Sequence, residues 1–229
     1  MTGERGFTVA EMVMGLAVFV IVLSAILAMV EVAVHNQDRV ARRVAANQRA
    51  RPLMTRLVDQ LHSGCVAPGV APVLTGSTET TLGFISKSGS TVSPTPDKYV
   101  VSLNNGALTE TVYPATGGAP PTWTFSGTPS STRELLKGVT TATAGTPSSS
   151  VPLFRYFAYV GGELSATPLS TPLSAEDAAK TVQVNISFAT LPANPNSTDP
   201  NQAISLSDAA ILRLEPASED SAEVNLPCV

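Results

Sequence analysis

The sequence predicts an α+β protein in which a long membrane-spanning helix at the N-terminus precedes a C-terminal domain of antiparallel β-sheet. Two observations predict this class. Residues 12 to 30 contain no charged side chain, and residues 65 to 229 alternate short apolar runs with Pro, Gly, Ser and Thr. The first pattern is typical of one helix that crosses a bilayer, and the second is typical of short strands joined by turns.

The apolar run from Met12 to Val30 is long enough to cross a membrane as a single helix. A helix rises about 1.5 Å per residue, so about 20 residues match the hydrocarbon core of a bilayer. In hydrocarbon, every backbone polar group must find its partner inside the segment, which favours a helix despite the many Val and Ile residues. The run is longer than the core of a secretory signal peptide, and no small-residue cleavage site follows it. The segment is therefore predicted to stay as an anchor.

Glu11 lies at the edge of this run in the string Gly6-Phe7-Thr8-Val9-Ala10-Glu11-Met12. An ionisable group at the edge of a membrane is costly without a partner, and no cation of the same helix is placed to supply one. The alternative is that Glu11 caps the start of the helix, where the helix dipole favours a negative charge.

This string resembles the cleavage and methylation signature of type IV prepilins and pseudopilins, which has a short leader ending in Gly, then Phe-Thr, then Glu at the fifth mature position. The resemblance implies that a membrane prepilin peptidase cuts after Gly6 and that Phe7 becomes the N-methylated terminus. It also implies that Glu11 neutralises the N-terminal ammonium of a neighbouring subunit inside a filament. The implied function is that of a structural subunit of a type IV pilus-like filament.

Two further features favour a minor pilin or minor pseudopilin within this superfamily. Ala28 stands where many major pilins carry a helix-breaking Pro, and the chain is longer than many major pilins need. The implied partners are other pilin or pseudopilin subunits and the inner-membrane platform of a type IV pilus, type II secretion or competence machine. The presence of Glu11 argues against the tip pseudopilin subtype that typically lacks this residue.

The distribution of positive charge conflicts with the topology that the resemblance implies. Arg5 and the chain amine precede the apolar run, whereas five arginines between Arg39 and Arg51 follow it. The positive-inside rule alone would keep the C-terminal part in the cytoplasm, but long domains cross largely regardless of charge. The expected location is a single pass of the cytoplasmic (inner) membrane, N-terminus inside and C-terminal domain outside, and then a filament or the cell surface.

After the apolar run, the helix is expected to continue as an amphipathic segment to His62. Pro52 should kink it, and Ser63-Gly64 should end it. By the resemblance, its second half packs on the globular domain; a coiled-coil partner helix remains the alternative. The apolar side chains expected to dock are Leu53, Met54, Leu57, Val58 and Leu61. The predicted segments are a leader (1–6), a transmembrane and assembly helix (7–34), its amphipathic continuation (35–62) and an extracytoplasmic β-rich domain (63–229).

Local patterns predict several elements of the β-rich part. Residues 99–103 and 108–113 are expected to form a hairpin around Asn104-Asn105-Gly106, because an Asn-Gly pair suits positive φ. Residues 182–188 alternate apolar and polar side chains, which predicts a strand with one packed and one wet face. The short apolar run 122–125 is also expected to contribute to the sheet. The remaining expectations are a capped helical turn at Ser174–Asp177, a last strand or a strand and loop within 205–214, and Pro/Gly/Ser-rich loops at 114–132, 143–150 and 192–203.

Cys65 and Cys228 are the only cysteines, and both fall on the predicted outer side of the membrane. A disulfide between them is expected in an oxidising compartment and would tie the C-terminal tail to the base of the long helix. Two free thiols are the alternative.

No enzymatic activity, metal or cofactor is expected. His35 and His62 lack companions at metal-ligand spacing, and the chain has no nucleophile-elbow or phosphate-binding motif. The acidic stretch 215–223 leaves a calcium site open.

Two other functions remain open. The first is a membrane-anchored adhesin or envelope-binding protein with an uncleaved signal anchor. The second is a DNA receptor that uses the arginines from Arg39 to Arg56. Residues 63 to 229 hold seven bases and thirteen acids, so no nucleic-acid partner is expected from bulk charge.

Overall fold

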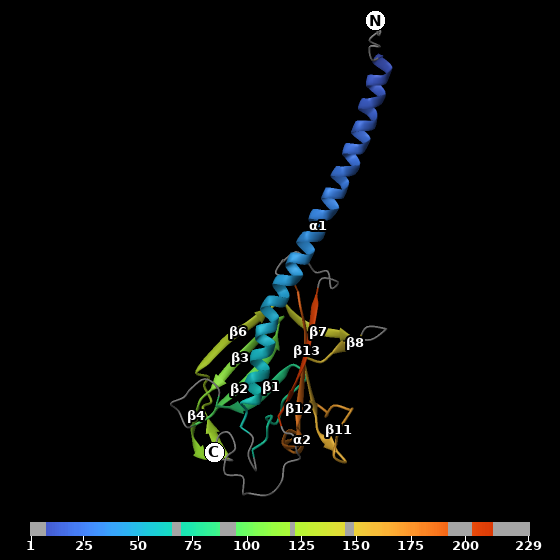
Figure 1. The fold of residues 1–229 in the computed structure, drawn as a ribbon. Coiled ribbons are helices and arrows are strands. Elements are labelled where there is room, and N and C mark those ends of the chain that lie inside the picture. The colour runs from blue at the N-terminus through green and yellow to red at the C-terminus, as the bar shows by residue number, and fades with distance from the viewer. Residues whose placement is uncertain are drawn as a thin grey trace. The chain divides into compact units, whose positions relative to one another are not determined.

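The computed structural model describes residues 8–65, 70–87, 95–119, 122–144, 149–191 and 203–212. The chain divides into two compact units, Met1–Val44 and Ala45–Val229. Helix α1 (Val9–His62) belongs to both units, whereas all described strands and the short helix α2 belong to the second (Figure 1). The α+β class and the antiparallel pairing of the strands are therefore confirmed.

The first unit consists of the N-terminal part of α1. This part is long and apolar enough to cross a membrane, and its most apolar stretch is not buried by any other part of the described chain. The polar side chain of Ser24, inside this stretch, bonds within the helix: its hydroxyl donates to the Val20 carbonyl at 2.8 Å. Such a bond removes the need for an external partner in an apolar environment. The segment fits the predicted single-pass anchor.

Helix α1 runs without interruption through Ala28 and Pro52. Pro52 removes one backbone hydrogen bond from the helix. The helix ends where the sequence predicted, because after His62 the Gly64 amide turns back and donates to the Leu61 carbonyl at 3.0 Å.

The second unit contains two larger antiparallel sheets and two small hairpins. The first sheet has the order β1-β2-β3-β6, and the second has the order β13-β12-β7-β8 with β9 also paired to β12. The strands of the first sheet are β1 (Thr81–Ser86), β2 (Asp97–Asn104), β3 (Ala107–Tyr113) and β6 (Ser131–Lys137). Those of the second are β7 (Val139–Ala144), β8 (Ser149–Val151), β9 (Phe154–Phe157), β12 (Gln183–Thr190) and β13 (Ile204–Ile211). The hairpins are β4 (Ala115–Ala119) with β5 (Thr122–Phe125), and β10 (Tyr159–Val160) with β11 (Glu163–Leu164).

The predicted hairpin is confirmed as β2 and β3. Asn104 pairs with Ala107, which leaves Asn105 and Gly106 as the two turn residues. Their φ angles are 48° and 74°, the left-handed values that a tight hairpin turn requires and that Asn and Gly adopt at least cost.

The predicted strand at 182–188 is confirmed as β12, but the expectation that its second face is wet is wrong in part. Val184, Ile186 and Phe188 are fully buried on one face, as expected. On the other face Ser187 is buried as well, and its hydroxyl bonds to that of Ser207 on β13 at 2.9 Å. β12 is an inner strand, hydrogen-bonded to β13 along one edge and to β7 and β9 along the other.

The expectation of a loop over the whole of 114–132 is also wrong, whereas the expected strand at 122–125 is confirmed as β5. This region contains the β4–β5 hairpin and the start of β6. Trp123 and Phe125 give the hairpin an apolar side that packs against the small cluster around Cys65. Gly118 has φ 91°, and a Cβ there would lie 2.3 Å from the Thr122 carbonyl oxygen. Gly118, one of the glycines that suggested a loop, is therefore needed by a close strand pair. At 143–150, β7 extends to Ala144 and β8 begins at Ser149, whereas 192–202 lie outside the described residues.

The other local predictions are confirmed. Ser174 caps α2 (Ala175–Lys180), and its hydroxyl oxygen accepts from the Asp177 amide at 3.0 Å. Asp177 thus takes the third position of the capping box. The last predicted strand is β13.

The second part of α1 forms one side of the core of the second unit. Ala50, Leu57 and Leu61 are at most 2% exposed, and they pack with side chains of both larger sheets, including Phe84 and Phe188. Leu53 and Met54 are buried too, and Val58 is partly buried against the same cluster. The predicted docking stripe is confirmed.

Tyr156 carries the largest fully buried side chain of this core. Its hydroxyl donates to the backbone carbonyls of Thr78 at 2.9 Å and Thr81 at 3.2 Å, which ties β9 to the segment that leads into β1. Burial raises the pKa of the Tyr156 hydroxyl above its usual value.

Replacing Tyr156 with phenylalanine is expected to lower the free energy of unfolding by about 1 kcal/mol at neutral pH, because the Thr78 carbonyl loses this donor and the Thr81 carbonyl keeps only the Thr78 amide, at 2.7 Å. In the wild type, the folded protein keeps a proton that the unfolded chain releases above about pH 10, so stability should fall as the pH rises past that value. The variant should show a shallower alkaline loss. Thermal unfolding of the full chain in detergent across this range measures both effects, and equal alkaline slopes would contradict the second.

Candidate assembly site at the start of the long helix

Thr8 and Glu11 form a reciprocal capping box at the start of α1. The backbone amide and the hydroxyl of Thr8 both donate to Glu11 Oε2 at 3.0 Å. In return, the Glu11 amide donates to Thr8 Oγ1 at 3.3 Å. The T-x-x-E spacing places the two side chains on the same first turn, where unpaired amides need acceptors. The capping role considered as an alternative for Glu11 is therefore present in the single chain.

This capping arrangement uses one oxygen of the Glu11 carboxylate. Both bonds from Thr8 end on Oε2, and the residue is exposed. Of the described residues, none forms an ion pair with Glu11. The carboxylate is thus held by the helix start through Oε2, and no described residue hydrogen-bonds to its Oε1 atom.

The other predicted site residues are distributed as follows. Gly6 and Phe7 lie outside the described residues, so the cleavage junction stays a prediction. Cys65 is disulfide-bonded and 1% exposed, and its amide donates to the Ile85 carbonyl at 2.8 Å. The alternative of two free thiols is therefore wrong, and the bonded state of Cys65 agrees with the predicted pairing, because Cys228 is the only other cysteine of the chain; Cys228 itself lies outside the described residues.

The two histidines are exposed residues of α1. His35 Nδ1 lies 3.0 Å from the Glu31 carbonyl oxygen, one helical turn earlier. In the part of the chain that the structure describes, no three His, Cys, Asp or Glu side chains come together as a metal ion would require. The acidic stretch 215–223, for which a calcium site was left open, falls outside it.

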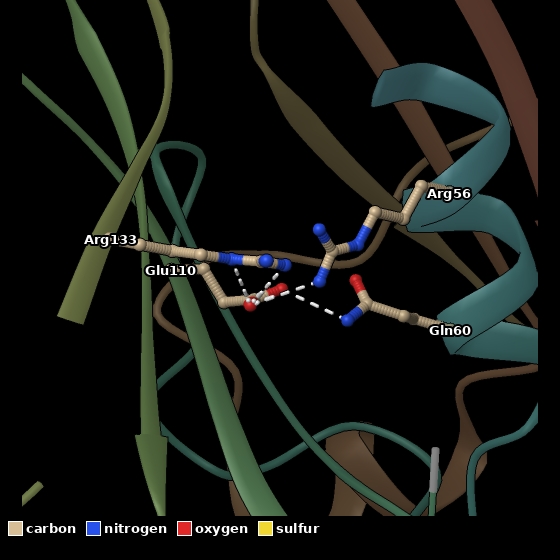
Figure 2. A network of polar contacts seen from close by, with 4 residues as sticks. All are labelled: Arg56, Gln60, Glu110 and Arg133. Atoms are coloured by element: carbon tan, nitrogen blue, oxygen red, sulfur yellow. Dashed lines mark hydrogen bonds and ion pairs between the residues drawn. The ribbon is translucent and has the colours of Figure 1, made fainter. Parts of the chain in front are cut away.

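A charge cluster in which two exposed arginines reach the buried Glu110 side chain is a feature that sequence reasoning missed (Figure 2). Glu110 on β3 is 2% exposed. Its Oε1 accepts from Arg133 of β6, with Nε at 2.9 Å and Nη2 at 2.8 Å, and from Arg56 Nη2 of α1 at 3.4 Å. Its Oε2 accepts from Gln60 Nε2 of α1 at 2.9 Å. Helix α1 is therefore joined to the first sheet by a paired charge as well as by apolar packing.

Both oxygens of Glu110 are occupied, so the cluster holds α1 on β3 and does not present a free acid or base. A sequence signal for it existed. Leu108, Glu110 and Val112 occupy alternate positions of one strand, which places a carboxylate on the face that the two apolar residues bury. A buried carboxylate needs cations as partners. Arg56 and Arg133 are far from Glu110 along the chain, so the local sequence does not indicate that they are these partners.

Comparison with protein-family models, with curated proteins and with solved structures finds no match for this chain.

Proposed function

We propose that this protein is a minor pilin or minor pseudopilin, a structural subunit of a type IV pilus-like filament. The observation that carries the proposal is the position of Glu11. It is the one acidic residue at the head of an exposed, otherwise uncharged apolar helix, and it follows Gly6 by five residues. A carboxylate in that position is costly in an apolar environment unless a cation meets it.

Processing after Gly6 would create that cation. The new ammonium at Phe7 lies near the start of the same helix, and two unlike charges attract far more strongly in an apolar filament core than in water. The open Oε1 atom of Glu11 gives the ammonium of a neighbouring subunit a place to bind while Thr8 holds Oε2. Because each subunit offers one ammonium and one carboxylate at different heights, the contact is heterologous and does not close, which produces a helical filament.

The exposed apolar stretch of α1 supports the same proposal. A helical stretch whose large apolar side chains are all exposed, as they are from Val9 to Val34, requires another apolar environment. The bilayer supplies it before assembly, and neighbouring α1 helices supply it within the filament. The partners in this proposal are the prepilin peptidase, other pilin or pseudopilin subunits, the assembly platform of the inner membrane and the lipid bilayer. The role is structural, without catalysis or a cofactor.

The N-terminal mass spectrum of the protein from membranes of its own host tests the proposal. We expect a mature chain that begins at Phe7 and carries one additional methyl group. A chain that retains residues 1–6 in cells with an active prepilin peptidase would contradict it. A Gly6→Leu variant is the control: it should keep the leader while the wild type loses it.

The second candidate is a membrane-anchored adhesin or envelope-binding protein with an uncleaved anchor. The capping box favours it, because Thr8 and Glu11 then have a structural role that needs no processing. The same mass spectrum separates the two functions, since an ordinary anchor leaves the bond between Gly6 and Phe7 intact.

A further inference from the structure

Three arginines follow the apolar stretch of α1 within a short distance. At about 1.5 Å per residue, Arg39 lies about 7.5 Å along the helix beyond Val34, and Arg43 lies about 13.5 Å beyond it. The polar headgroup layer of a bilayer is roughly 5 to 8 Å thick on each side, and the long arginine side chain extends this reach. If α1 crosses a membrane, these guanidinium groups therefore lie at headgroup level or just outside it.

The same segment has an apolar side. Arg39 is three positions before Arg42 and four before Arg43, so the three share one face of the helix. Val40 and Val44 are four positions apart and share another face, and they are 60% and 48% exposed. A cationic face beside an exposed apolar stripe is typical of helices that lie at a membrane interface. We call Arg39, Arg42, Arg43, Val40 and Val44 the arginine-valine segment.

We propose that the arginine-valine segment binds the headgroups of anionic phospholipids on the side of the membrane where α1 emerges. A soluble acidic partner would match the arginines but would leave the valines exposed, whereas a lipid surface accommodates both. This proposal requires only that α1 cross a membrane, and it holds whether or not the leader is removed.

The chemistry of the side chains suits a phosphodiester. A guanidinium offers two parallel N–H donors that match two phosphate oxygens, and it is more weakly hydrated than an ammonium. All three cations of the segment are arginines. Arg42 and Arg43 already interact with other groups of the chain, but each guanidinium has five N–H donors and can bind a phosphate as well.

Native mass spectrometry of the full chain tests whether the arginine-valine segment binds anionic phospholipids. The protein is released from detergent micelles that contain equal amounts of phosphatidylglycerol and phosphatidylcholine, and the ratio of the two lipids that stay bound is measured. The wild type should retain phosphatidylglycerol in preference. In the triple variant Arg39→Ala, Arg42→Ala, Arg43→Ala this preference should fall by roughly fivefold for each arginine removed. Alanine preserves the helix, which circular dichroism verifies.

Two matched variants complete the test. Replacing Lys87, Lys137 and Lys180 with alanine removes the same number of positive charges from exposed sites of the second unit and should leave the lipid ratio unchanged. Replacing the three arginines with lysines should retain part of the preference. Equal retention of both lipids by the wild type, or an equal loss in the two alanine variants, would overturn the proposal. So would an arginine variant that keeps the lipid ratio but loses self-association, since the partner would then be a second copy of the chain.

Discussion

Replacing Glu11 with alanine is expected to abolish incorporation of the protein into filaments while leaving its insertion into the membrane intact. Insertion depends on the uncharged run from Met12 to Val30, which the substitution lengthens. Assembly depends on the charge pair, and leaving a desolvated ammonium without its partner costs about 3 to 5 kcal/mol at each contact. Subunit association should therefore weaken by at least about 100-fold, which a comparison of sheared filaments with membrane fractions would measure.

Two control variants separate the filament role of Glu11 from its capping role. Thr8→Ala removes the hydroxyl that bonds to Glu11 but keeps the carboxylate, so it should still assemble. Glu11→Gln keeps an oxygen that can accept from the Thr8 amide but has no charge, so it should fail to assemble. The reverse pattern, with assembly lost in Thr8→Ala and normal in Glu11→Gln, would show that Glu11 acts only as a helix cap.

Elements set by neighbouring residues were predictable from the sequence. The uncharged run gives the membrane part of α1, the Asn105-Gly106 pair gives the β2–β3 turn, and Ser174 with Asp177 gives the start of α2. In each case the signal and the structure lie within a few residues of one another. The capping box was predictable in the same way, because Thr8 and Glu11 are three residues apart.

Elements set by distant contacts were not predictable. The apolar run 122–125 indicates β5, but β4 reads as a loop because its glycines are turn formers, and only the contact with the cluster around Cys65 shows where Trp123 and Phe125 pack. Strand order also depends on such contacts: β6 pairs with β3, whereas β7, the next strand, pairs with β12. A pattern of alternating residues identifies a strand, but it does not name the neighbour of that strand.

Loss of the arginines around Glu110 is expected to reduce the stability of the second unit strongly. Replacing Arg56 and Arg133 together with alanine is expected to lower the free energy of unfolding by about 3 kcal/mol, because Glu110 then keeps only Gln60 as a partner for a buried negative charge. Each single variant should cost less than half of this, since the remaining guanidinium still neutralises the carboxylate. Arg133→Ala should cost more than Arg56→Ala, because Arg133 makes the two shorter contacts, at 2.8 and 2.9 Å. Urea unfolding of the full chain in detergent, followed by the fluorescence of Trp123, measures these differences.

Adding Glu110→Leu to the double variant tests whether the unpaired charge of Glu110 causes the loss of stability. Leucine at this position extends the apolar face of Leu108 and Val112 and removes the unpaired carboxylate, so the triple variant should regain most of the lost stability. Lys180→Ala is the control, because its partner Glu176 is exposed and the pair lies at the surface; it should show no measurable change. If the triple variant were as unstable as the double variant, the arginines would act through the packing of their side-chain stems, and the electrostatic account of how α1 is held on β3 would be wrong.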